Sequence, residues 1–239
     1  MKVDILAFGV HPDDVELSCS GTLLRHIEMG YTVGLCDLSR GELGTRGNAQ
    51  LRMQEAEQAR IMLGASFRLN LEMADGFFVH DKEHILKIVR IIRKYKPEIV
   101  LANALSDRHP DHGRAAKLIA DACFYSGLIK IETSDDEGNI QDSWRPSAVY
   151  HYIQDRNLKA DFVVDIANYM DKKLDIIMAF SSQFYSPESD EPETPISKRD
   201  FLDFVKSKNK SYARDAGFEY AEAFNSGRNI GVTDLFDLK

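Results

Sequence analysis

Residues 3–17 read VDILAFGVHPDDVEL, so that an apolar run, a polar tetrapeptide and the start of a helical pattern follow one another. The run Val3–Val10 predicts a strand buried on both faces, because its apolar residues do not alternate with polar ones. Val15–Met29 has the periodicity of an amphipathic helix, which Gly30 ends. The tetrapeptide His11–Asp14 lies between the two, where a strand turns into a helix.

Strand and helix signals continue to alternate along the first half of the chain, and more irregularly along the second half. The further strands are expected at 32–38, 68–71, 98–102, 149–153 and 162–166. The further helices are expected at 51–63, 82–95, about 114–124, 169–180 and 199–213. This order predicts an α/β protein with three layers and a mainly parallel, Rossmann-like sheet. Because no repeat or linker divides the chain, we expect one domain over residues 1–239.

The composition excludes several classes of protein. Thirty Lys and Arg against 38 Asp and Glu give the chain a formal net charge of −8, whereas nucleic-acid-binding proteins carry a basic excess or stripe. The three cysteines have no CxxC spacing, which is typical of buried thiols in a reducing compartment. No apolar run approaches the ~20 residues that span a bilayer, and Asp4 interrupts the N-terminal run. We therefore expect a cytoplasmic protein that binds neither nucleic acid nor membranes.

Polar residues follow four successive strands at the point where each strand ends. They are His11–Asp14, the Gly-rich loop Arg40–Asn48, the pair Asp75–Gly76 and the segment Asp107–His112. In open α/β sheets, ligands bind at the carboxyl ends of the strands. We therefore expect these residues to meet at one edge of the sheet and to form the functional site.

Two of these clusters contain a set of side chains that suits a catalytic metal ion. His11, Asp14 and His112 offer two nitrogens and one oxygen, which suits Zn²⁺ with a fourth position open for water, and Fe²⁺ accepts the same donors. Asp13 and His109 remain for the base and the acid that hydrolysis needs. An isolated His-x-x-Asp is more often a helix cap beside a surface histidine, but two such tetrapeptides at strand ends of one sheet favour a metal site. The remaining histidines, expected to be exposed or core residues, are His26, His80, His84 and His151.

Four arginines near the same edge predict an anionic group on the substrate. They are Arg40, Arg46, Arg52 and Arg108. Any single one of them would as readily pair with a neighbouring acid. The loop Gly41–Gly47 lacks the GxGxxG spacing and a Walker lysine, which excludes a dinucleotide-binding oxidoreductase, and no serine stands in a GxSxG motif.

The tetrapeptides His11–Asp14 and His109–His112 resemble those of the LmbE/PIG-L family of zinc-dependent N-deacetylases. Further segments are more specifically similar to the branch that makes bacillithiol: Arg40–Gly47, Asp107–Arg108, Val164–Ile166, Ser182–Phe184 and Tyr220–Phe224. The resemblance implies an LmbE-like fold with zinc held by His11, Asp14 and His112. It also implies the following roles: Asp13 as general base, His109 as the group that assists the oxyanion and the leaving amine, Asp111 as the residue that orients His109, and Arg52 and Asp75 as contacts to the sugar.

Enzymes of that branch remove the acetyl group of N-acetylglucosaminyl-malate, and relatives often form trimers or hexamers. The resemblance thus implies a homo-oligomer that acts on a small sugar conjugate with an anionic aglycone, and we expect Arg46 and Arg108 to contact the malate carboxylates. A chitooligosaccharide deacetylase and a thiol-conjugate amidase are alternatives within the enzymes. A non-catalytic sugar- or metal-binding protein is a third, although such a protein has no need of Asp13 and His109.

Three details stay open at this point. Either Asp13 or His109 can protonate the leaving amine. The segment Ser186–Pro195, rich in proline and acidic residues, is a surface loop or a lid. Cys19-Ser20-Gly21 stands where relatives often carry paired glycines, and we expect this difference to change packing rather than activity.

Overall fold

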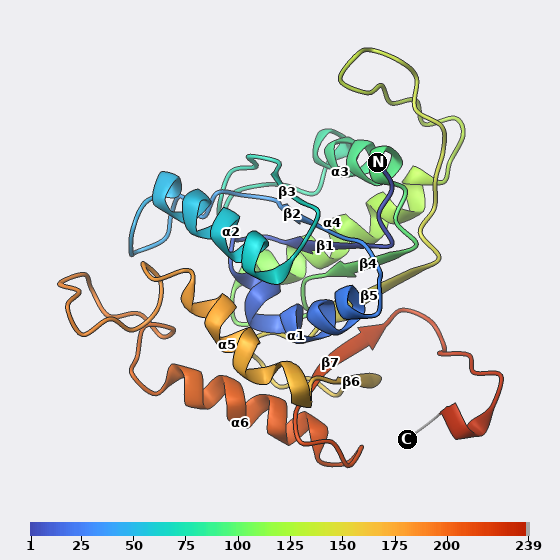
Figure 1. The fold of residues 1–239 in the computed structure, drawn as a ribbon. Coiled ribbons are helices and arrows are strands. Elements are labelled where there is room, and N and C mark those ends of the chain that lie inside the picture. Colours follow the sequence, from blue (N-terminus) through green and yellow to red (C-terminus); the bar gives the residue numbers. More distant parts are fainter. Residues whose placement is uncertain (238–239) are drawn as a thin grey trace.

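The computed structural model describes residues 1–237, which form a seven-stranded sheet with helices on both faces (Figure 1). The strands are β1 (Ile5–Gly9), β2 (Val33–Asp37), β3 (Phe67–Asn70), β4 (Ile99–Ala102), β5 (Ala148–Tyr152), β6 (Phe162–Asp165) and β7 (Ala221–Ser226). Their order across the sheet is β3-β2-β1-β4-β5-β7-β6. Strands β1 to β5 pair in parallel, whereas β7 runs antiparallel to both β5 and β6. The predicted α/β class and mainly parallel sheet are confirmed.

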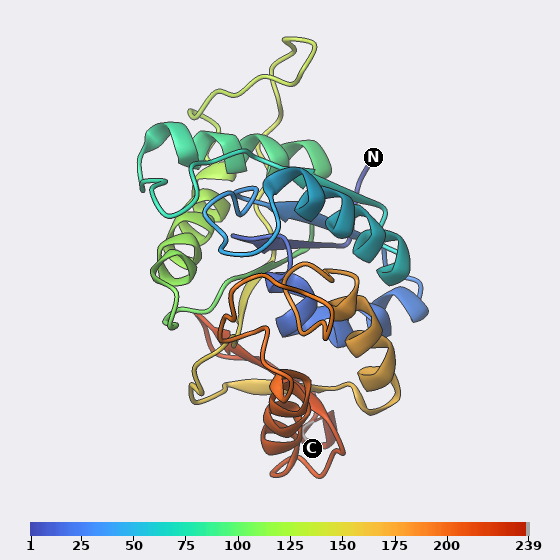
Figure 2. The same ribbon diagram turned by 90° about the vertical axis from the view of Figure 1, so that its left-hand side faces the viewer.

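Six α-helices cover the sheet in the described part of the chain. They are α1 (Asp14–Glu28), α2 (Ala49–Leu63), α3 (Lys82–Tyr95), α4 (Pro110–Ser126), α5 (Met170–Met178) and α6 (Phe201–Ala213). Helices α3 and α4 lie on one face, α1, α2 and α5 lie on the other, and α6 packs beside β7 (Figures 1 and 2). Within residues 1–237, no helix has both the length and the apolar character needed to pass through a bilayer.

The hydrophobic core has two parts, one on each side of the sheet. Along β1, Leu6 and Phe8 pack with the residues of α3 and α4, whereas Ile5 and Ala7 pack with those of α1, α2 and α5. Successive side chains of a strand point to opposite faces. A strand covered on both faces therefore needs apolar residues at every position, which explains the unbroken run in the sequence.

Local signals set the boundaries of α2, and the end of this helix before Gly64 is as predicted. The side chain of Asn48 accepts a hydrogen bond from Leu51 N at the start of α2, and Gly64 ends that helix in the left-handed conformation. The predicted start of α4 near Arg114 is wrong, because the helix begins at Pro110. Proline suits the first helical position, where its missing N–H has no partner to lose. The second His motif is therefore the cap and first turn of α4 rather than a loop.

A buried ion pair connects β7 and α5 to the middle of α1. Lys173 Nζ on α5 donates to Glu222 Oε1 on β7 at 2.5 Å, and both side chains are fully buried. The Glu222 carboxylate also accepts hydrogen bonds from Gly21 N and Thr22 N of α1, at 3.0 and 2.6 Å. These contacts fix α1 against β7, the last strand along the chain. The first turn of α1 carries part of the functional site.

Candidate metal centre and its cavity

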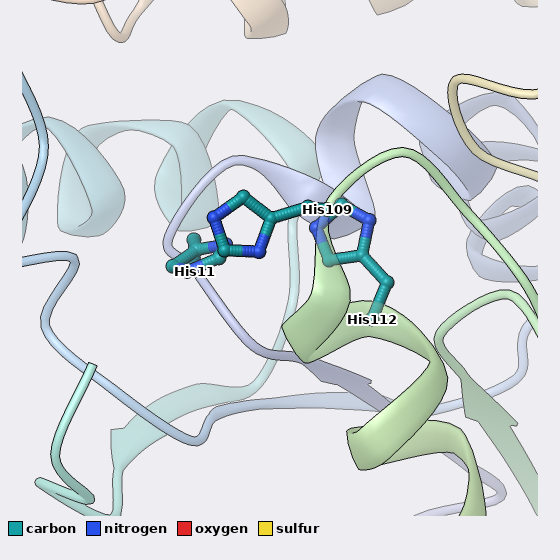
Figure 3. Close-up of side chains that lie close together, drawn as sticks. All are labelled: His11, His109 and His112. Carbon is teal, nitrogen blue, oxygen red and sulfur yellow. The ribbon is translucent and has the colours of Figure 1, made fainter. Parts of the chain in front are cut away.

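Three histidines from two separate segments of the chain meet at the carboxyl end of the central strands (Figure 3). His11 follows β1, whereas His109 and His112 come from the start of α4, which follows the neighbouring strand β4. The centres of the His11 and His109 rings are 4.7 Å apart, and those of His109 and His112 are 5.2 Å apart. One nitrogen from each ring lies within 4.8 Å of the others, so the three rings can share one metal ion.

Asp14, at the start of α1, adds an ionised carboxylate to this cluster. Its Oδ1 lies 3.2 Å from His112 Nε2 and its Oδ2 lies 3.8 Å from His11 Nδ1. Burial alone would raise the pKa of Asp14, but His112, His11 and the hydrogen bonds that they donate hold that pKa far below the ordinary range. Asp14 thus has the charge that a metal ligand requires.

His112 is surrounded by negative charge on both sides of its ring. Its Nδ1 lies 2.6 Å from Asp107 Oδ2, opposite the contact of Nε2 with Asp14. Although burial opposes it, the two carboxylates raise the pKa of His112 to about 10. A proton on His112 Nε2 uses the same electron pair that a metal ion would use. Asp14 would stabilise the positive charge of either the proton or the metal ion.

A second group of possible ligands includes His11 with two carboxylates. His11 Nε2 lies 2.9 Å from Asp75 Oδ1 and 4.0 Å from Asp111 Oδ2, and the three donor atoms lie within 4.8 Å of one another. Asp75 Oδ2 also accepts from Leu43 N, which holds the Gly-rich loop beside the site. His11 is thus common to both groups, and the predicted set His11–Asp14–His112 stays a prediction.

Asp111 lies next to His109 but contacts it differently from the expected way. His109 Nδ1 accepts a hydrogen bond from the backbone N–H of Asp111 at 3.3 Å. The Asp111 carboxylate instead accepts from Gly76 N and Arg114 Nη1, both at 2.8 Å. Burial and the neighbouring imidazoles of His11 and His112 lower the pKa of His109.

Asp13 is buried, strained and paired with a single arginine. Arg52 Nη2 on α2 donates to Asp13 Oδ2 at 2.6 Å. Burial raises the pKa of Asp13 more than the Arg52 guanidinium lowers it. The backbone of Asp13 has φ 145°, a region that L-residues rarely adopt and that often marks functional positions. A buried carboxylate with a raised pKa beside possible metal ligands has the properties of a general base.

Arg52 fits against the Gly-rich loop because that loop carries a glycine at position 41. A Cβ at Gly41 would lie 2.4 Å from Arg52 Nη1, and the backbone there has φ +66°. The Nε of Arg52 has no hydrogen-bond partner among the described residues, and Arg52 lines the cavity described next. Arg52 can therefore hold Asp13 and still offer a donor to a ligand.

A cavity of about 260 Å³ extends from these residues to α6. Its polar end contains seven residues predicted from the sequence: His11, Asp13, Asp14, Arg52, Asp75, His109 and His112. Its other wall is mostly apolar and includes Leu17, Ile153, Ile196, Phe201, Phe204 and Val205. Arg108 also lines the cavity, and its Nε donates to Asp155 Oδ2 at 2.8 Å.

Arg46, predicted to bind the same substrate group as Arg108, lies elsewhere. Its guanidinium donates to Ser182 O and Ser189 Oγ, both at 2.9 Å, and it is only 6% exposed. Glu191 Oε1 accepts from Gly47 N of the same loop. Arg46 thus connects the Gly-rich loop to the segment 182–191, and its charge is already engaged there.

Two residues of the site were not predicted from the sequence. Gln154 Nε2 lies 3.0 Å from Asp14 Oδ1 and 3.4 Å from His112 Nε2. It follows β5, so the rule that ligands lie at strand ends, applied to this strand as well, would have found it. Lys208 lines the cavity from α6, a helix outside the strand ends, and no local motif indicates it.

Comparisons with known proteins find relatives in both sequence and fold. Residues 6–123 match the model of the PIG-L family, described as GlcNAc-PI de-N-acetylase. Over 190 residues, 75% of this chain and 70% of the relative, the sequence is 27% identical to diacetylchitobiose deacetylase from Thermococcus kodakarensis. Over 203 residues, 74% of this chain and 73% of the relative, it is 26% identical to 4-oxalmesaconate hydratase from Pseudomonas putida. The crystal structure of the conserved protein TT1542 from Thermus thermophilus superimposes with a TM-score of 0.86 at 30% identity, covering 98% of both chains.

Proposed function

We propose that this chain, whose residues 6–123 match the PIG-L family model, hydrolyses the N-acetyl group of an N-acetylglucosamine conjugate. The observation that carries this proposal is the position of Asp13 beside the histidine cluster, at the polar end of one cavity. Amide hydrolysis needs an activated water, a polarised carbonyl and a proton for the amine. The cluster has a side chain for each of these needs.

Zinc is the metal that we propose, with His11, Asp14 and His112 as its ligands. Two imidazole nitrogens and one carboxylate oxygen are a donor set that zinc accepts in catalytic sites, and Fe²⁺ accepts it as well. The negative charge around His112 supports the fit, because that charge already attracts a proton to the same nitrogen. When bound, such an ion supplies Lewis-acid chemistry, since it polarises the acetamide carbonyl and makes water more acidic.

The side chains of the chain itself would move the protons. Arg52 holds Asp13 Oδ2, which leaves the other carboxylate oxygen of Asp13 to accept a proton from the attacking water. The oxygen of that water then bonds to the acetyl carbon, and the C–N bond breaks as the sugar nitrogen is protonated. Asp13, which has just gained a proton, and His109 are the two groups able to supply it. The products are acetate and a free amine.

For the substrate, we propose N-acetylglucosaminyl-malate, the conjugate of bacillithiol biosynthesis. The position of Arg108 in the cavity supports an anionic aglycone, whereas Arg46 does not add to this support. N,N′-diacetylchitobiose is the neutral alternative, because the relative from Thermococcus kodakarensis is a deacetylase of that disaccharide.

Hydration of an unsaturated carboxylic acid is a second candidate function. It is supported by the 26% identity to 4-oxalmesaconate hydratase, which covers 73% of that protein. A base that takes a proton from water could serve either reaction, and Arg108 could bind a carboxylate in both. The two reactions differ in product, since hydration releases no acetate.

We expect acetate release from N-acetylglucosaminyl-malate that is lost after chelation and restored by zinc. The measurement compares this conjugate, N,N′-diacetylchitobiose and 4-oxalmesaconate, the last followed by its ultraviolet absorbance. A strong preference for the malate conjugate would support the substrate proposed here. Equal turnover of the two acetylated sugars would leave a general deacetylase. Loss of absorbance without acetate release would instead favour the hydratase.

Replacing Asp107 by asparagine should weaken zinc binding by about 10- to 100-fold, because carboxylates that orient a ligating imidazole have effects of this size. Asp107 Oδ2 lies 2.6 Å from His112 Nδ1, and an amide in its place would lose the charge. Competition with a chromophoric chelator measures the affinity. Asp121→Asn, the same change at a residue that pairs with Lys117 on α4, is the matched control. Wild-type affinity in D107N would contradict the role given to Asp107.

A further inference from the structure

Lys208 on α6 is a buried amine for which the described residues provide no hydrogen-bond partner. Burial lowers the pKa of Lys208 to about 8, against the opposing effect of Asp107 and Asp155. A buried ammonium group without a partner is costly, and native proteins normally pair such groups. Lys208 therefore requires an explanation.

The carboxylates near Lys208 already have partners. Asp107 accepts from Arg156 N and contacts His112, at 2.7 and 2.6 Å. Asp155 accepts from Arg108 Nε at 2.8 Å. Lys173 also affects the pKa of Lys208, but it is itself a cation and is paired with Glu222. Lys208 is thus the cation left without a partner in this part of the described structure.

The same helix face that carries Lys208 forms the wall of the cavity. Phe201, Phe204, Val205, Lys208 and Tyr212 recur at helical spacing, and all five line the cavity. The polar side chains that α6 adds to this wall are Lys208, Asn209, whose amide donates to Ala221 O, and Tyr212, whose hydroxyl donates to Leu158 O. Arg108 lines the same cavity from the loop before α4. Two cations from separate elements therefore share the space beyond the histidine cluster.

We propose that Lys208 is a specificity-determining residue, whose ammonium binds a carboxylate on the group that the substrate carries beside its acetylated sugar. This inference rests on the function proposed above and deepens it. A carboxylate placed there would form a charge-assisted hydrogen bond in a desolvated setting, where such bonds are strong. A neutral conjugate would leave Lys208 buried and unpaired, so the site would disfavour it.

The test compares Lys208→Met and Lys208→Arg on two substrates. Hydrogen bonds to charged groups have effects of about 10- to 100-fold, so K208M should raise KM for N-acetylglucosaminyl-malate by this factor. Its kcat for both substrates should stay within about twofold of wild type, and its KM for N,N′-diacetylchitobiose should stay the same or fall, because the variant no longer leaves an unpaired ammonium beside a neutral conjugate. K208R should retain most of the affinity because it retains the charge. Lys206→Met, two residues away on α6, is the matched control, and it should leave kcat and KM for both substrates unchanged.

Binding of free L-malate, measured by calorimetry, separates this inference from the proposed function. The wild type should bind L-malate and K208M should bind it about 10- to 100-fold more weakly, whether or not acetate is released. Absence of acetate release with this pattern of binding would overturn the proposed function and leave the Lys208 contact standing. No malate binding by the wild type, or equal effects of K208M on both sugars, would overturn the inference. Melting temperatures of all variants identify any effect that comes from unfolding.

Discussion

Replacing Asp13 by asparagine should lower kcat for acetate release by about 10²- to 10⁴-fold, the usual contribution of a general base. The amide has nearly the same shape but cannot accept the proton of the attacking water. Because the two side chains have nearly the same shape, the backbone at φ 145° need not move. Acetate release at saturating substrate, with metal content determined on the same sample, measures the effect.

Metal content is the decisive control for this variant. Asp13 neighbours Asp14, so a loss of activity that only reflects a loss of metal would not support the base. D13N also leaves the Arg52 guanidinium without its counter-ion, and its melting temperature should fall for that reason. Arg52→Lys retains a positive charge beside Asp13 and should therefore retain far more activity than D13N. A fully metallated D13N enzyme with the kcat of the wild type would remove Asp13 from the mechanism.

Replacing Lys173 by methionine should reduce the free energy of unfolding by about 3–5 kcal/mol, the range expected when one partner of a buried ion pair is removed. Lys173 and Glu222 are both fully buried, and Lys173 Nζ also donates to Leu17 O at 2.8 Å. Methionine fills a similar volume, but it leaves the Glu222 carboxylate without a positive charge. Urea denaturation followed by circular dichroism measures the change.

The double variant K173M/E222Q tests whether the pair itself is responsible. Because the charge left behind by K173M is removed in the double variant, its loss of stability should be smaller than the sum of the two single losses. Lys117→Met removes the cation of an exposed pair with Asp121 and should change stability by about 0.5 kcal/mol or less. If K173M were as stable as wild type, the buried pair would have no net role in stability.

Most of the fold could be predicted because its signals are local. The apolar run of β1 and the glycine after α2 are visible in the sequence, and alternating strands and helices leave few topologies. Strand β7 was missed because Ala221–Ser226 contains alanine, glutamate and asparagine, which are rare in strands. Its buried Glu222 is stabilised by Lys173 and by the amides of α1, which are far away in the sequence.

The functional site also contains some residues that could be predicted from local sequence signals and others that could not. The side chains that follow β1 and β4 were predicted because the sheet itself fixes where a strand end lies. Arg46 was expected in the cavity from its place in the Gly-rich loop, but the segment that engages it lies about 136 residues further on. Lys208 belongs to a helix whose apolar face resembles any other, and only the packed structure shows that this face borders the cavity.

The hydrogen bonds from α1 to Glu222 also affect when this protein can fold during its synthesis. Gly21 and the carboxylate that it contacts are separated by 201 residues, and ribosomes add about 5–20 residues per second. Roughly 10–40 seconds therefore pass between the synthesis of the first helix and that of its partner. Throughout this interval the amides in the middle of α1 lack their native acceptor. We therefore expect the nascent chain to complete the native contacts of α1 only after Glu222 has been made.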